Sequence, residues 1–568
     1  MQQHVFAIAK TLATLGVKHV IICPGSRSAP LVYAFADDKN FCCYSVIDER
    51  SAAFIALGMA QQIKQPVVLI CTSGSALLNF FPAIAEAYYQ KIPLIVLTAD
   101  RPPEFLNQQD GQMIMQKNIY GTHVHYSDEL PCYTIGKENF KKTSEIIFTA
   151  FQISKRKLGP VHINVPLREP LYDRIKLTAE KKDTLPASIK LNAPFTETKI
   201  KRQQNKALID AWKRSKKKII LIGQFPVNDK LFTALRAFKN IGDTVILCDI
   251  LSNKQSVCTI PNFDLVLSQA NEKTLKQLEP DMLISIGGPV LSKSLKLWLK
   301  NQKPNYHFRI QDDNDLIDTY NNVTQFIRDD HFETLKVLGS FSDINSDYKK
   351  FWQALDKRTN EAVDSFLEQY SPKKRNQKFS ELHATNIILK NIPDAVNFHI
   401  ANSSCIRYVS LLGKLNDSWV MSGNRGTSGI DGCTSTALGA ALINNRLTLL
   451  LTGDLAFLYD RNALWNKHVP NNLRIIVFNN FGGGIFQLID GPSSHKNKLN
   501  YFTTPHQTRI KNTVLDNDME YYFCDSEEGL KKVLPAFFDP DKRASVLEIT
   551  FDMDQNAGIF KAFKKIKI

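Results

Sequence analysis

Short apolar runs alternate with amphipathic helical segments along almost the whole chain. Runs of three to five residues are followed by helical patterns, such as those at residues 50–63 and 76–89. Apolar strands separated by helices are typical of βαβ units, in which the strands are parallel and helices cover both faces of the sheet. The alternation therefore predicts an α/β fold of doubly wound parallel sheets. In the first part of the chain, strands are expected at residues 20–23, 43–47, 67–71, 94–98 and 161–165.

The alternation is interrupted twice, which divides the 568 residues into three predicted domains. A Lys-, Thr- and Asn-rich segment at about residues 186–206 is typical of a linker, and a polar connector runs from about 341 to 380. We therefore expect domains at residues 1–185, 186–370 and 371–568. Further strands are expected at residues 219–222, 245–248, 265–267, 282–286 and 306–310, and then at 397–400, 419–421, 447–451, 475–478 and 546–550.

The composition indicates a globular protein without membrane insertion. Hydrophobic residues make up 43% and charged residues 22% of the chain. No apolar run approaches the roughly 18 residues of a membrane-spanning helix, and the N-terminus lacks the pattern of a signal peptide, which favours the cytoplasm. The net charge of +15 comes from dispersed basic residues without interleaved aromatic ones. We therefore expect no nucleic acid partner.

Two expected strands of the third domain lead into residues suited to binding a metal ion. The run at residues 447–451 precedes Asp454, and the run at 475–478 precedes Asn480. Because ligands collect at the carboxyl ends of parallel strands, we expect the Asp454 carboxylate, the Asn480 amide and the Gly482 carbonyl to lie together. Such hard oxygen ligands suit Mg²⁺ or Mn²⁺ that holds a diphosphate. An ordinary strand–turn–helix is the alternative.

The same segment is also suited to binding the diphosphate itself. Gly453 is expected to let the chain turn tightly, and the segment from Leu455 onward can offer helix N-terminal amides to an anion. Asn480 follows Asp454 after 26 residues. This spacing resembles the signature of the thiamine diphosphate-dependent enzymes, in which Gly-Asp is followed by Asn-Asn at a similar distance.

Further motifs extend the resemblance over the whole chain and indicate one family among the thiamine diphosphate-dependent enzymes. They lie at residues 24–28, 98–104, 424–432 and 479–486. Together they are similar to the synthases of menaquinone biosynthesis, which decarboxylate 2-oxoglutarate on thiamine diphosphate and add the succinyl carbanion equivalent to isochorismate in a 1,4-addition. The resemblance implies a transferase with pyrimidine-binding, central and diphosphate-binding domains. It also implies a homodimer or homotetramer with active sites between subunits.

The resemblance assigns the cofactor residues. Glu49 would share a proton with N1′ of the aminopyrimidine, which suits a carboxyl group of raised pKa in a semi-apolar site. A helix N-terminal acid stabilised by the helix dipole is the alternative. Ile430 would be the stiff apolar wedge that bends the cofactor. Further cofactor contacts are implied for Ser73, Gly74, Gly453, Asp454, Leu455, Asn480, Gly482 and Ile485.

Both implied substrates are dicarboxylates, and arginine binds carboxylates bidentately while it stays charged. The motifs match Ser403, Arg407 and Arg425 to the 2-oxoglutarate side. They match Ser26, Arg27, Arg101 and Gln112 to the isochorismate side, Lys293 to a lysine from the central domain, and Phe486 and Leu488 to apolar walls that exclude water. Surface ion pairs are the alternative for each arginine.

Two residues depart from the pattern of the family. Gly111 and Phe481 stand where asparagine is expected, so a side-chain contact to isochorismate is missing while the metal ligands are kept. Two other functions stay open. One is a different thiamine diphosphate-dependent 2-oxoacid decarboxylase or carboligase, which would need fewer arginines. The other is a silent thiamine-fold subunit, for which loss of Glu49, Asp454 or Asn480 would be the signature.

Overall fold

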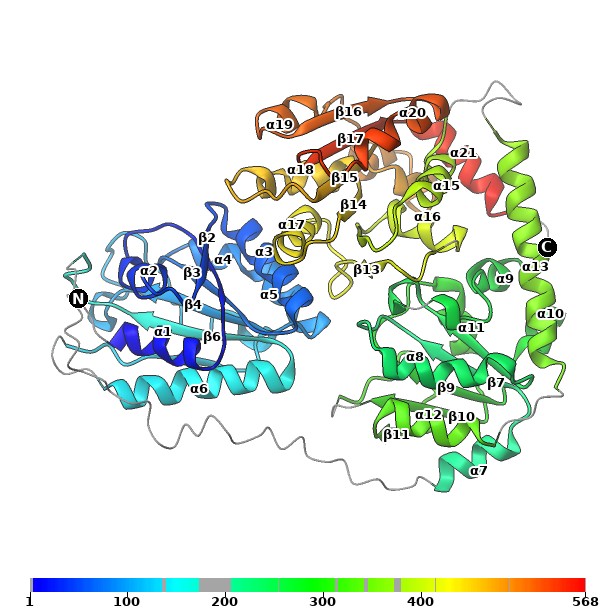
Figure 1. Ribbon diagram of the computed structural model, residues 1–568, viewed down its shortest axis with the longest axis horizontal. Coiled ribbons are helices and arrows are strands. Elements are labelled where there is room, and N and C mark those ends of the chain that lie inside the picture. Colours follow the sequence, from blue (N-terminus) through cyan, green and yellow to red (C-terminus); the bar gives the residue numbers. More distant parts are fainter. Residues whose placement is uncertain are drawn as a thin grey trace.

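Three parallel β-sheets, each covered by helices on both faces, make up the computed structural model of the chain (Figure 1). The strand pairs of the described residues are all parallel. The fold class predicted from the sequence is therefore confirmed. The structure describes residues 4–134, 139–172, 206–253, 255–311, 315–341, 346–371, 379–413, 415–489 and 491–566.

The expected linker at residues 186–206 lies outside the described residues, except for its last position. Residues 342–345 and 372–378 of the expected connector lie outside them as well. The exact limits of the three domains therefore stay predictions, although each sheet falls inside one of the predicted ranges. Within the described part of the chain, no helix combines the length and the apolar character that crossing a membrane requires.

The first sheet has the strand order β2-β1-β3-β4-β6-β5. Its strands are β1 (His19–Ile22), β2 (Cys42–Ser45), β3 (Val67–Cys71), β4 (Leu94–Asp100), β5 (Ser127–Glu129) and β6 (Pro160–Pro166), and its helices are α1 (His4–Thr14), α2 (Ala29–Ala36), α3 (Glu49–Ile63), α4 (Ala76–Asn79), α5 (Phe81–Gln90) and α6 (Phe140–Lys157). In β3, Leu69 packs with α3 and α5, whereas Val68 packs with α1 and α6 on the opposite face. Both faces are thus buried, which explains the unbroken apolar run.

The second sheet has the order β11-β10-β9-β7-β8. Its strands are β7 (Lys218–Ile222), β8 (Thr244–Cys248), β9 (Met282–Ile286), β10 (Tyr306–Gln311) and β11 (Gln325–Arg328), and its helices include α7 (Lys206–Arg214), α8 (Asp229–Arg236), α9 (Phe263–Gln269), α10 (Glu272–Leu278), α11 (Lys293–Asn301) and α12 (His331–Gly339). The strand expected at residues 265–267 is wrong, because this segment lies inside α9. Leu265 packs in the core of the third domain and Val266 in that of the central domain, so the helix is apolar on two sides and resembles a buried strand.

The third sheet has the order β13-β12-β14-β15-β17-β16. Its strands are β12 (Asn397–Ile400), β13 (Val420–Ser422), β14 (Thr448–Gly453), β15 (Leu473–Asn479), β16 (Glu520–Cys524) and β17 (Ser545–Thr550), and its helices include α15 (Glu381–Asn391), α16 (Ser404–Leu412), α17 (Cys433–Ile443), α18 (Asp454–Tyr459), α19 (Lys511–Leu515), α20 (Glu527–Phe537) and α21 (Met553–Phe563). The core of β12, β14, β15 and β17 was expected from the sequence, and the edge strand β16 was not.

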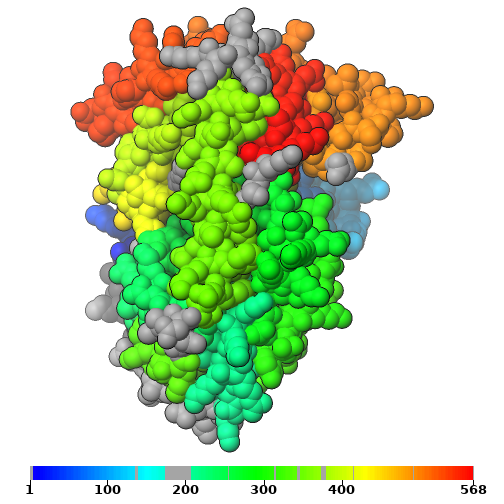
Figure 2. Space-filling model, turned by 90° about the vertical axis from the view of Figure 1, so that its right-hand side faces the viewer, coloured from blue at the N-terminus to red at the C-terminus, as the bar shows by residue number. Residues whose placement is uncertain are grey.

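A long helix, α13 (Tyr348–Gln369), connects the second and third domains. Its first half buries Trp352 in the core of the central domain, and its second half buries Phe366 in the core of the third. Figure 2 shows this helix along the surface, from the green central domain to the red α21, where the rings of Phe366 and Phe563 lie 5.3 Å apart. The helix is therefore part of both cores and connects the two domains rigidly.

The first and third domains meet where α3 crosses α17 (Figure 1). Two glycines allow the contact. A Cβ at Gly58 would lie 2.0 Å from the carbonyl oxygen of Thr436, and a Cβ at Gly439 would lie 2.0 Å from that of Ile55. The two helix backbones therefore touch directly, and no larger residue fits at either position.

We expect Gly58→Ala to lower the free energy of unfolding by about 2 kcal/mol or more, because the added methyl group must push α3 and α17 apart. The overlap outweighs the higher helix propensity of alanine. The matched control is Gly558→Ala in α21, where a Cβ would meet no atom within 4 Å. This variant should be neutral or stabilising by up to about 1 kcal/mol. Calorimetric unfolding of both variants is the measurement, and equal midpoints would contradict the close crossing.

Candidate active site

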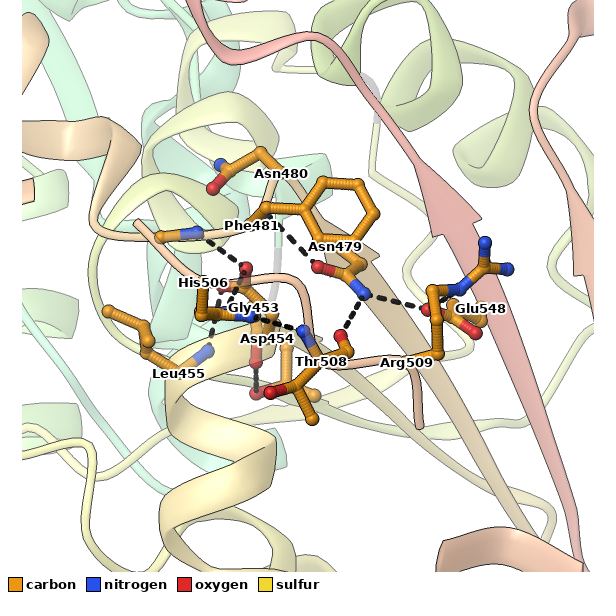
Figure 3. Close-up of polar contacts among 12 residues, drawn as sticks. Gly453, Asp454, Leu455, Asn479, Asn480, Phe481, His506, Thr508, Arg509 and Glu548 are labelled. Atoms are coloured by element: carbon orange, nitrogen blue, oxygen red, sulfur yellow. Dashed lines mark hydrogen bonds and ion pairs between the residues drawn. The ribbon is translucent and has the colours of Figure 1, made fainter. Parts of the chain in front are cut away.

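Strands β14 and β15 end side by side, because Gly453 pairs with Phe478 in the parallel ladder. Asp454 follows as the first residue of α18 (Figure 3). One of its carboxylate oxygens accepts the N–H of Leu455 at 2.7 Å, and the other accepts the N–H of Gly482 at 2.9 Å. Desolvation raises the pKa of this buried carboxyl group above its ordinary value. The carboxylate thus ties the turn after β15 to the start of α18.

The two glycines of this region differ in what they provide. The chain turns tightly here, because α18 begins directly after β14 ends at Gly453. Gly453 has a φ of −91° and a ψ of 165°, an extended conformation that any residue adopts, so the turn does not require glycine. A Cβ at Gly453 would meet no atom within 4 Å, so glycine leaves open space beside the N-terminus of α18. Gly482 has a φ of 154°, and a Cβ there would lie 2.8 Å from the carbonyl oxygen of Thr503. Only glycine fits at this second position.

Asn480 has one atom that the described residues leave without a partner. Its Nδ2 donates to Oε1 of Glu381 at 2.6 Å, whereas its buried Oδ1 accepts no hydrogen bond from the part of the chain that the structure describes. A buried acceptor without a donor is costly. A divalent cation between Oδ1 and the Asp454 carboxylate would satisfy it, so these residues fit a metal ion. The Gly482 carbonyl accepts the N–H of Gly484 at 2.9 Å and keeps a second lone pair.

The preceding residue, Asn479, holds the turn in place (Figure 3). Its side-chain oxygen accepts the N–H of Phe481 at 3.1 Å, and its Nδ2 donates to Oε1 of the fully buried Glu548 at 2.7 Å. Arg509 donates to the same carboxylate oxygen at 3.0 Å. Phe481, which departs from the family pattern, has a φ of 62°, a left-handed conformation that asparagine adopts more easily than phenylalanine. Its ring packs edge-on against His506 at 6.0 Å.

Glu49 is the first residue of α3, and Asp48 caps this helix by accepting the N–H of Ser51 at 3.1 Å. Desolvation raises the pKa of the half-buried Glu49, the charge of Asp48 adds to the rise, and a hydrogen bond to its own backbone opposes it. The residues beside Glu49 contact the third domain. Asn462 donates to Asp48 at 2.8 Å, and Arg50 donates to the carbonyl of Tyr459 at 2.6 Å. The helix start is therefore fixed against the end of α18.

A cavity of about 130 Å³ lies at the carboxyl ends of the first sheet. Five of the residues named from the sequence line it, from the segments that follow β1, β3 and β4. The lining residues are Ser26, Arg27, Ser73, Arg101, Gln112, Glu169, Leu171 and Tyr172. The backbone of Gln112 is in the left-handed region, with a φ of 54°. Such strain at the wall of a polar cavity is typical of binding sites.

Both arginines of this cavity are paired with carboxylates of the same chain. Arg27, which is 9% exposed, lies 3.1 Å from an oxygen of Glu169, and Arg101 lies 2.8 Å from an oxygen of Asp110. The Nε of Arg101 also donates to the carbonyl of Gly111 at 2.9 Å. The acidic partners are much more exposed than the arginines, at 65% and 45%. A carboxylate ligand could therefore replace them.

A second pair of arginines lies near the third sheet. Arg425 donates to Oδ1 of Asn402 at 2.7 Å, and Arg407 donates to the carbonyl of Ser403 at 2.5 Å. Desolvation first, and the nearby charge of Arg425 second, lower the pKa of Arg407. Ser403 has a φ of 76°, a conformation that is strained for serine. Two neighbouring cations, Arg407 on α16 and Arg425 on the loop after β13, are suited to binding an anion.

The remaining predicted residues lie at the edges of this region. Lys293 is the exposed first residue of α11, and none of the described contacts joins it to Arg425. Lys296, one turn later, was not named from the sequence, yet desolvation and the charge of Arg425 lower its pKa. Ile430 is 36% exposed on the loop before α17. The segment after Gly483 carries the buried Ile485 and the half-buried Phe486 and Leu488.

Two family models match the chain. The model described as "Thiamine pyrophosphate enzyme, N-terminal TPP binding domain" matches residues 4–119. The model described as "Middle domain of thiamine pyrophosphate" matches residues 183–400. The first and the central domain of the chain are therefore similar to domains of the thiamine diphosphate enzymes.

Proteins named 2-succinyl-5-enolpyruvyl-6-hydroxy-3-cyclohexene-1-carboxylate synthase are similar to the chain over nearly its whole length. The one from Flavobacterium psychrophilum is 36% identical, over 96% of this chain and 95% of that protein. The one from Cytophaga hutchinsonii is 37% identical, over 99% and 98%. The one from Desulfotalea psychrophila is 36% identical, over 95% and 99%. The chain belongs to this synthase family.

Membership of the synthase family confirms the resemblance that the motifs indicated, and it makes the chain a thiamine diphosphate-dependent enzyme. It does not test the residue assignments. The structure gathers those assignments into three groups of side chains: the turns after β14 and β15, the cavity of the first domain, and the loops around Arg425.

Sequence reasoning missed several residues that hold this synthase site together. Gln116, which is fully buried, accepts the N–H of Gly74 at 3.0 Å. His506 lies 3.2 Å from the Asp454 carboxylate. Glu381 binds Asn480. Each partner is more than 40 residues away in sequence and belongs to none of the motifs, so no pattern in the sequence signals the contact.

Glu381 gives a testable pH dependence. Burial raises the pKa of this carboxyl group to about 7, with a further rise from the charge of Asp454, while hydrogen bonds from Asn480 and Tyr408 oppose the shift. The folded protein therefore keeps a proton that the unfolded chain releases at its ordinary pKa of about 4.3. The contribution of Glu381 to stability is full below that pH and is lost as the pH rises to about 7.

We expect Glu381→Gln to remove this loss, so that the variant gains stability relative to the unaltered protein between about pH 4.5 and 7. Thermal unfolding of the metal-free protein across this range is the measurement. Asp356→Asn is a useful comparison, because burial also raises the pKa of Asp356, which lies far from the site on α13. A constant difference between Glu381→Gln and the unaltered protein at all pH values would contradict the shift.

Proposed function

We propose that the chain decarboxylates 2-oxoglutarate and adds the remaining succinyl unit to isochorismate in a 1,4-addition. The product is the compound for which the relatives are named, 2-succinyl-5-enolpyruvyl-6-hydroxy-3-cyclohexene-1-carboxylate. The observation that carries the proposal is the cavity of the first domain, where two arginines and three polar residues named from the motifs lie together. This lining suits a carboxylate-bearing substrate with hydroxyl groups.

We propose that Asp454, Asn480 and the Gly482 carbonyl bind Mg²⁺ or Mn²⁺ and that the metal holds the cofactor diphosphate. The buried Oδ1 of Asn480, which has no hydrogen-bond partner among the described residues, supports this assignment. The open space beside Gly453 leaves room for the diphosphate at the N-terminus of α18. Ser73, Gly74, Leu455, Ile430 and Ile485 are proposed as further cofactor contacts.

The cofactor, when bound, supplies the nucleophilic carbon and accepts the electron pair that remains after loss of CO₂. Glu49 would hold and return the proton that activates it, which is consistent with the raised pKa of its carboxyl group. Arg407 and Arg425, with Ser403, would bind the carboxylates of the 2-oxoglutarate chain, and Lys293 would assist. Phe486 and Leu488 would exclude water from the reacting carbon.

On the isochorismate side, the proposal assigns Ser26, Arg27, Arg101 and Gln112. The arginines would exchange Glu169 and Asp110 for substrate carboxylates, and the serine and amide would bind the ring hydroxyl or the enol ether oxygen. Gly111 contributes only its backbone carbonyl, which already accepts from Arg101. The missing asparagine side chain is therefore expected to affect affinity rather than the reaction.

We further propose that the active enzyme is a homodimer or homotetramer with sites between subunits. Large apolar side chains are exposed beside the residues assigned to the cofactor. Ile47 lies two residues before Glu49 and is 53% exposed. Tyr459, the last residue of α18, is 54% exposed, and Trp465, after this helix, is 56% exposed. A second subunit would cover them. Sedimentation of the purified protein tests this proposal, and a monomer that is fully active would contradict it.

The alternative is another thiamine diphosphate-dependent 2-oxoacid decarboxylase or carboligase. The deciding experiment follows isochorismate consumption with thiamine diphosphate, Mg²⁺ and 2-oxoglutarate, and omits each component in turn. Consumption that needs all three supports the synthase. CO₂ release from a different 2-oxoacid, without isochorismate consumption, would favour the alternative.

We expect Glu49→Gln to lower kcat by about a hundredfold or more, because an amide cannot exchange the proton that activates the cofactor. Binding of thiamine diphosphate, followed by tryptophan fluorescence, should change little, since the diphosphate and metal are held by the third domain. Asp330→Asn is the control, because Asp330 caps α12 in the central domain, asparagine also caps a helix, and turnover should be preserved. Normal rates for Glu49→Gln would overturn the proton-sharing role.

We expect Arg407→Ala and Arg425→Ala each to raise the KM for 2-oxoglutarate by about ten- to a hundredfold, the effect of losing a charge-assisted hydrogen bond. The KM for isochorismate should change much less. Arg543→Ala is the control, because Arg543 pairs with Asp518 at the surface, where both side chains are more than half exposed. Unchanged saturation curves for both site variants would remove these arginines from the 2-oxoglutarate side.

A further inference from the structure

The loop at residues 423–432, which connects β13 to α17, is held by a carboxylate of the first domain. Glu86, on α5, is 1% exposed. Its Oε1 accepts the N–H of Gly426 at 2.8 Å, and its Oε2 accepts both the N–H and the hydroxyl of Thr427 at 2.6 Å. One buried carboxylate thus binds three donors of a loop that lies 340 residues further along the chain. Hydrogen bonds to an ionised group such as a carboxylate are stronger than hydrogen bonds between neutral groups.

A second residue of α5, Gln90, extends this contact to the central domain. Its Nε2 donates to Glu86 at 2.5 Å and to the carbonyl of Gly423 at 3.2 Å. Its Oε1 accepts from Gln224 of the central domain at 3.2 Å. The start of the loop is therefore fixed where all three domains meet, and Glu86 and Gln90 form one face of α5 toward it.

The contact is also close at the level of the backbone. A Cβ at Gly426 would lie 2.6 Å from the carbonyl oxygen of Glu86 and 3.1 Å from the Cβ of Tyr89. Glycine is therefore required for the loop to reach the carboxylate. Because this contact restricts the backbone at Gly426, it also restricts the backbone of the preceding residue, Arg425.

Arg425 is the residue whose position this arrangement determines. Its guanidinium donates to Asn402 at 2.7 Å, and Asn402 donates to the carbonyls of Asn424 and Gly429 at 2.7 Å each. The loop is thus closed on itself by Asn402 and attached to the first domain by Glu86. Desolvation lowers the pKa of Arg425, and the charges of Asp249 and Glu86 oppose this shift.

We propose that Glu86 is a positioning residue for 2-oxoglutarate: it holds the loop so that Arg425 meets a carboxylate of this substrate. The inference rests on the proposed role of Arg425. Glu86 does not itself touch the substrate, because both of its oxygens are occupied by Gly426, Thr427 and Gln90. Its ionised form is the one that can accept all of these bonds. Preorganisation of this kind matters because a binding group that is already held in place loses less freedom when its ligand binds, which raises affinity.

The first test compares Glu86→Gln with the unaltered enzyme in steady-state kinetics. Glutamine keeps the size of the side chain but turns an NH₂ group toward donors that need an acceptor. We expect the KM for 2-oxoglutarate to rise about tenfold, as for a lost charge-assisted bond. The KM for isochorismate should stay within about twofold, because the residues assigned to it lie on segments of the first domain. The Kd for thiamine diphosphate should also stay within about twofold, because the diphosphate and the metal are assigned to the turns after β14 and β15, even though Ile430 lies on the same loop.

Three further variants separate positioning from folding. Thr427→Val removes only the hydroxyl donor and should raise the same KM by a smaller factor, whereas Thr427→Ser keeps the hydroxyl and should restore values close to those of the unaltered enzyme. Asp356→Asn removes a buried carboxylate that binds Asn262 at 2.9 Å in the central domain. It should lower the thermal midpoint without changing the KM for 2-oxoglutarate.

Hydrogen exchange gives a readout that does not depend on catalysis. In Glu86→Gln, the amides of Gly426 and Thr427 should exchange faster by about tenfold or more, since each loses its acceptor. Unchanged exchange and an unchanged KM would overturn the proposal. A joint rise in both KM values and in the cofactor Kd would also overturn it, because Glu86 would then be a general structural residue. If the unaltered protein does not consume isochorismate, the proposed function fails, while the exchange experiment still decides whether Glu86 holds the loop.

Discussion

The crossing of α3 and α17 is the contact on which the active site depends. Gly58 and Gly439 let the two helix backbones touch, so the first and third domains share one hydrophobic core. Both helices carry candidate site residues at their N-termini: α3 begins at Glu49, and α17 follows directly on the loop that carries Ile430. A small change in the crossing would therefore move, within each subunit, the residues proposed as the proton-transfer group and the cofactor wedge. The two glycines have no chemical role, yet they determine where the chemical groups lie.

The sequence predicted the buried centre of each sheet better than its edges. Central strands such as β3 and β9 are buried on both faces, which produces an unbroken apolar run that is easily recognised. The edge strands β5, β11 and β16 are partly exposed and polar, so they lack this pattern. The error at α9 has a different origin. A short helix between two cores is apolar on both sides, and its periodicity cannot be distinguished from that of a buried strand.

For the site, the sequence could predict the residues that follow the strands but not the residues that hold them. The segments after β1, β3 and β4 bring Arg27, Ser73 and Arg101 into one cavity, because parallel strands place their carboxyl ends together. The supporting contacts of Glu86 and Glu381 join segments about 340 and 99 residues apart. Such contacts depend on how whole domains pack. Gly453 shows a different limit: the sequence predicted the tight turn there, but the backbone does not need glycine for it, and glycine instead leaves open space among the described residues.

The arginines of the site also differ in how their charge is compensated, and this difference determines what a bound carboxylate would replace. Arg27 and Arg101 already have exposed carboxylate partners, so a ligand must compete with Glu169 and Asp110. Arg407 and Arg425 lie near each other, and the charge of Arg425 disfavours the charge of Arg407. A dianionic ligand would relieve this repulsion, whereas at the first pair it replaces an existing attraction. The two pairs therefore differ in what a ligand replaces: carboxylate partners at Arg27 and Arg101, and solvent-poor surroundings beside a second cation at Arg407. Arg425 differs again, because the charges of Asp249 and Glu86 partly balance its own.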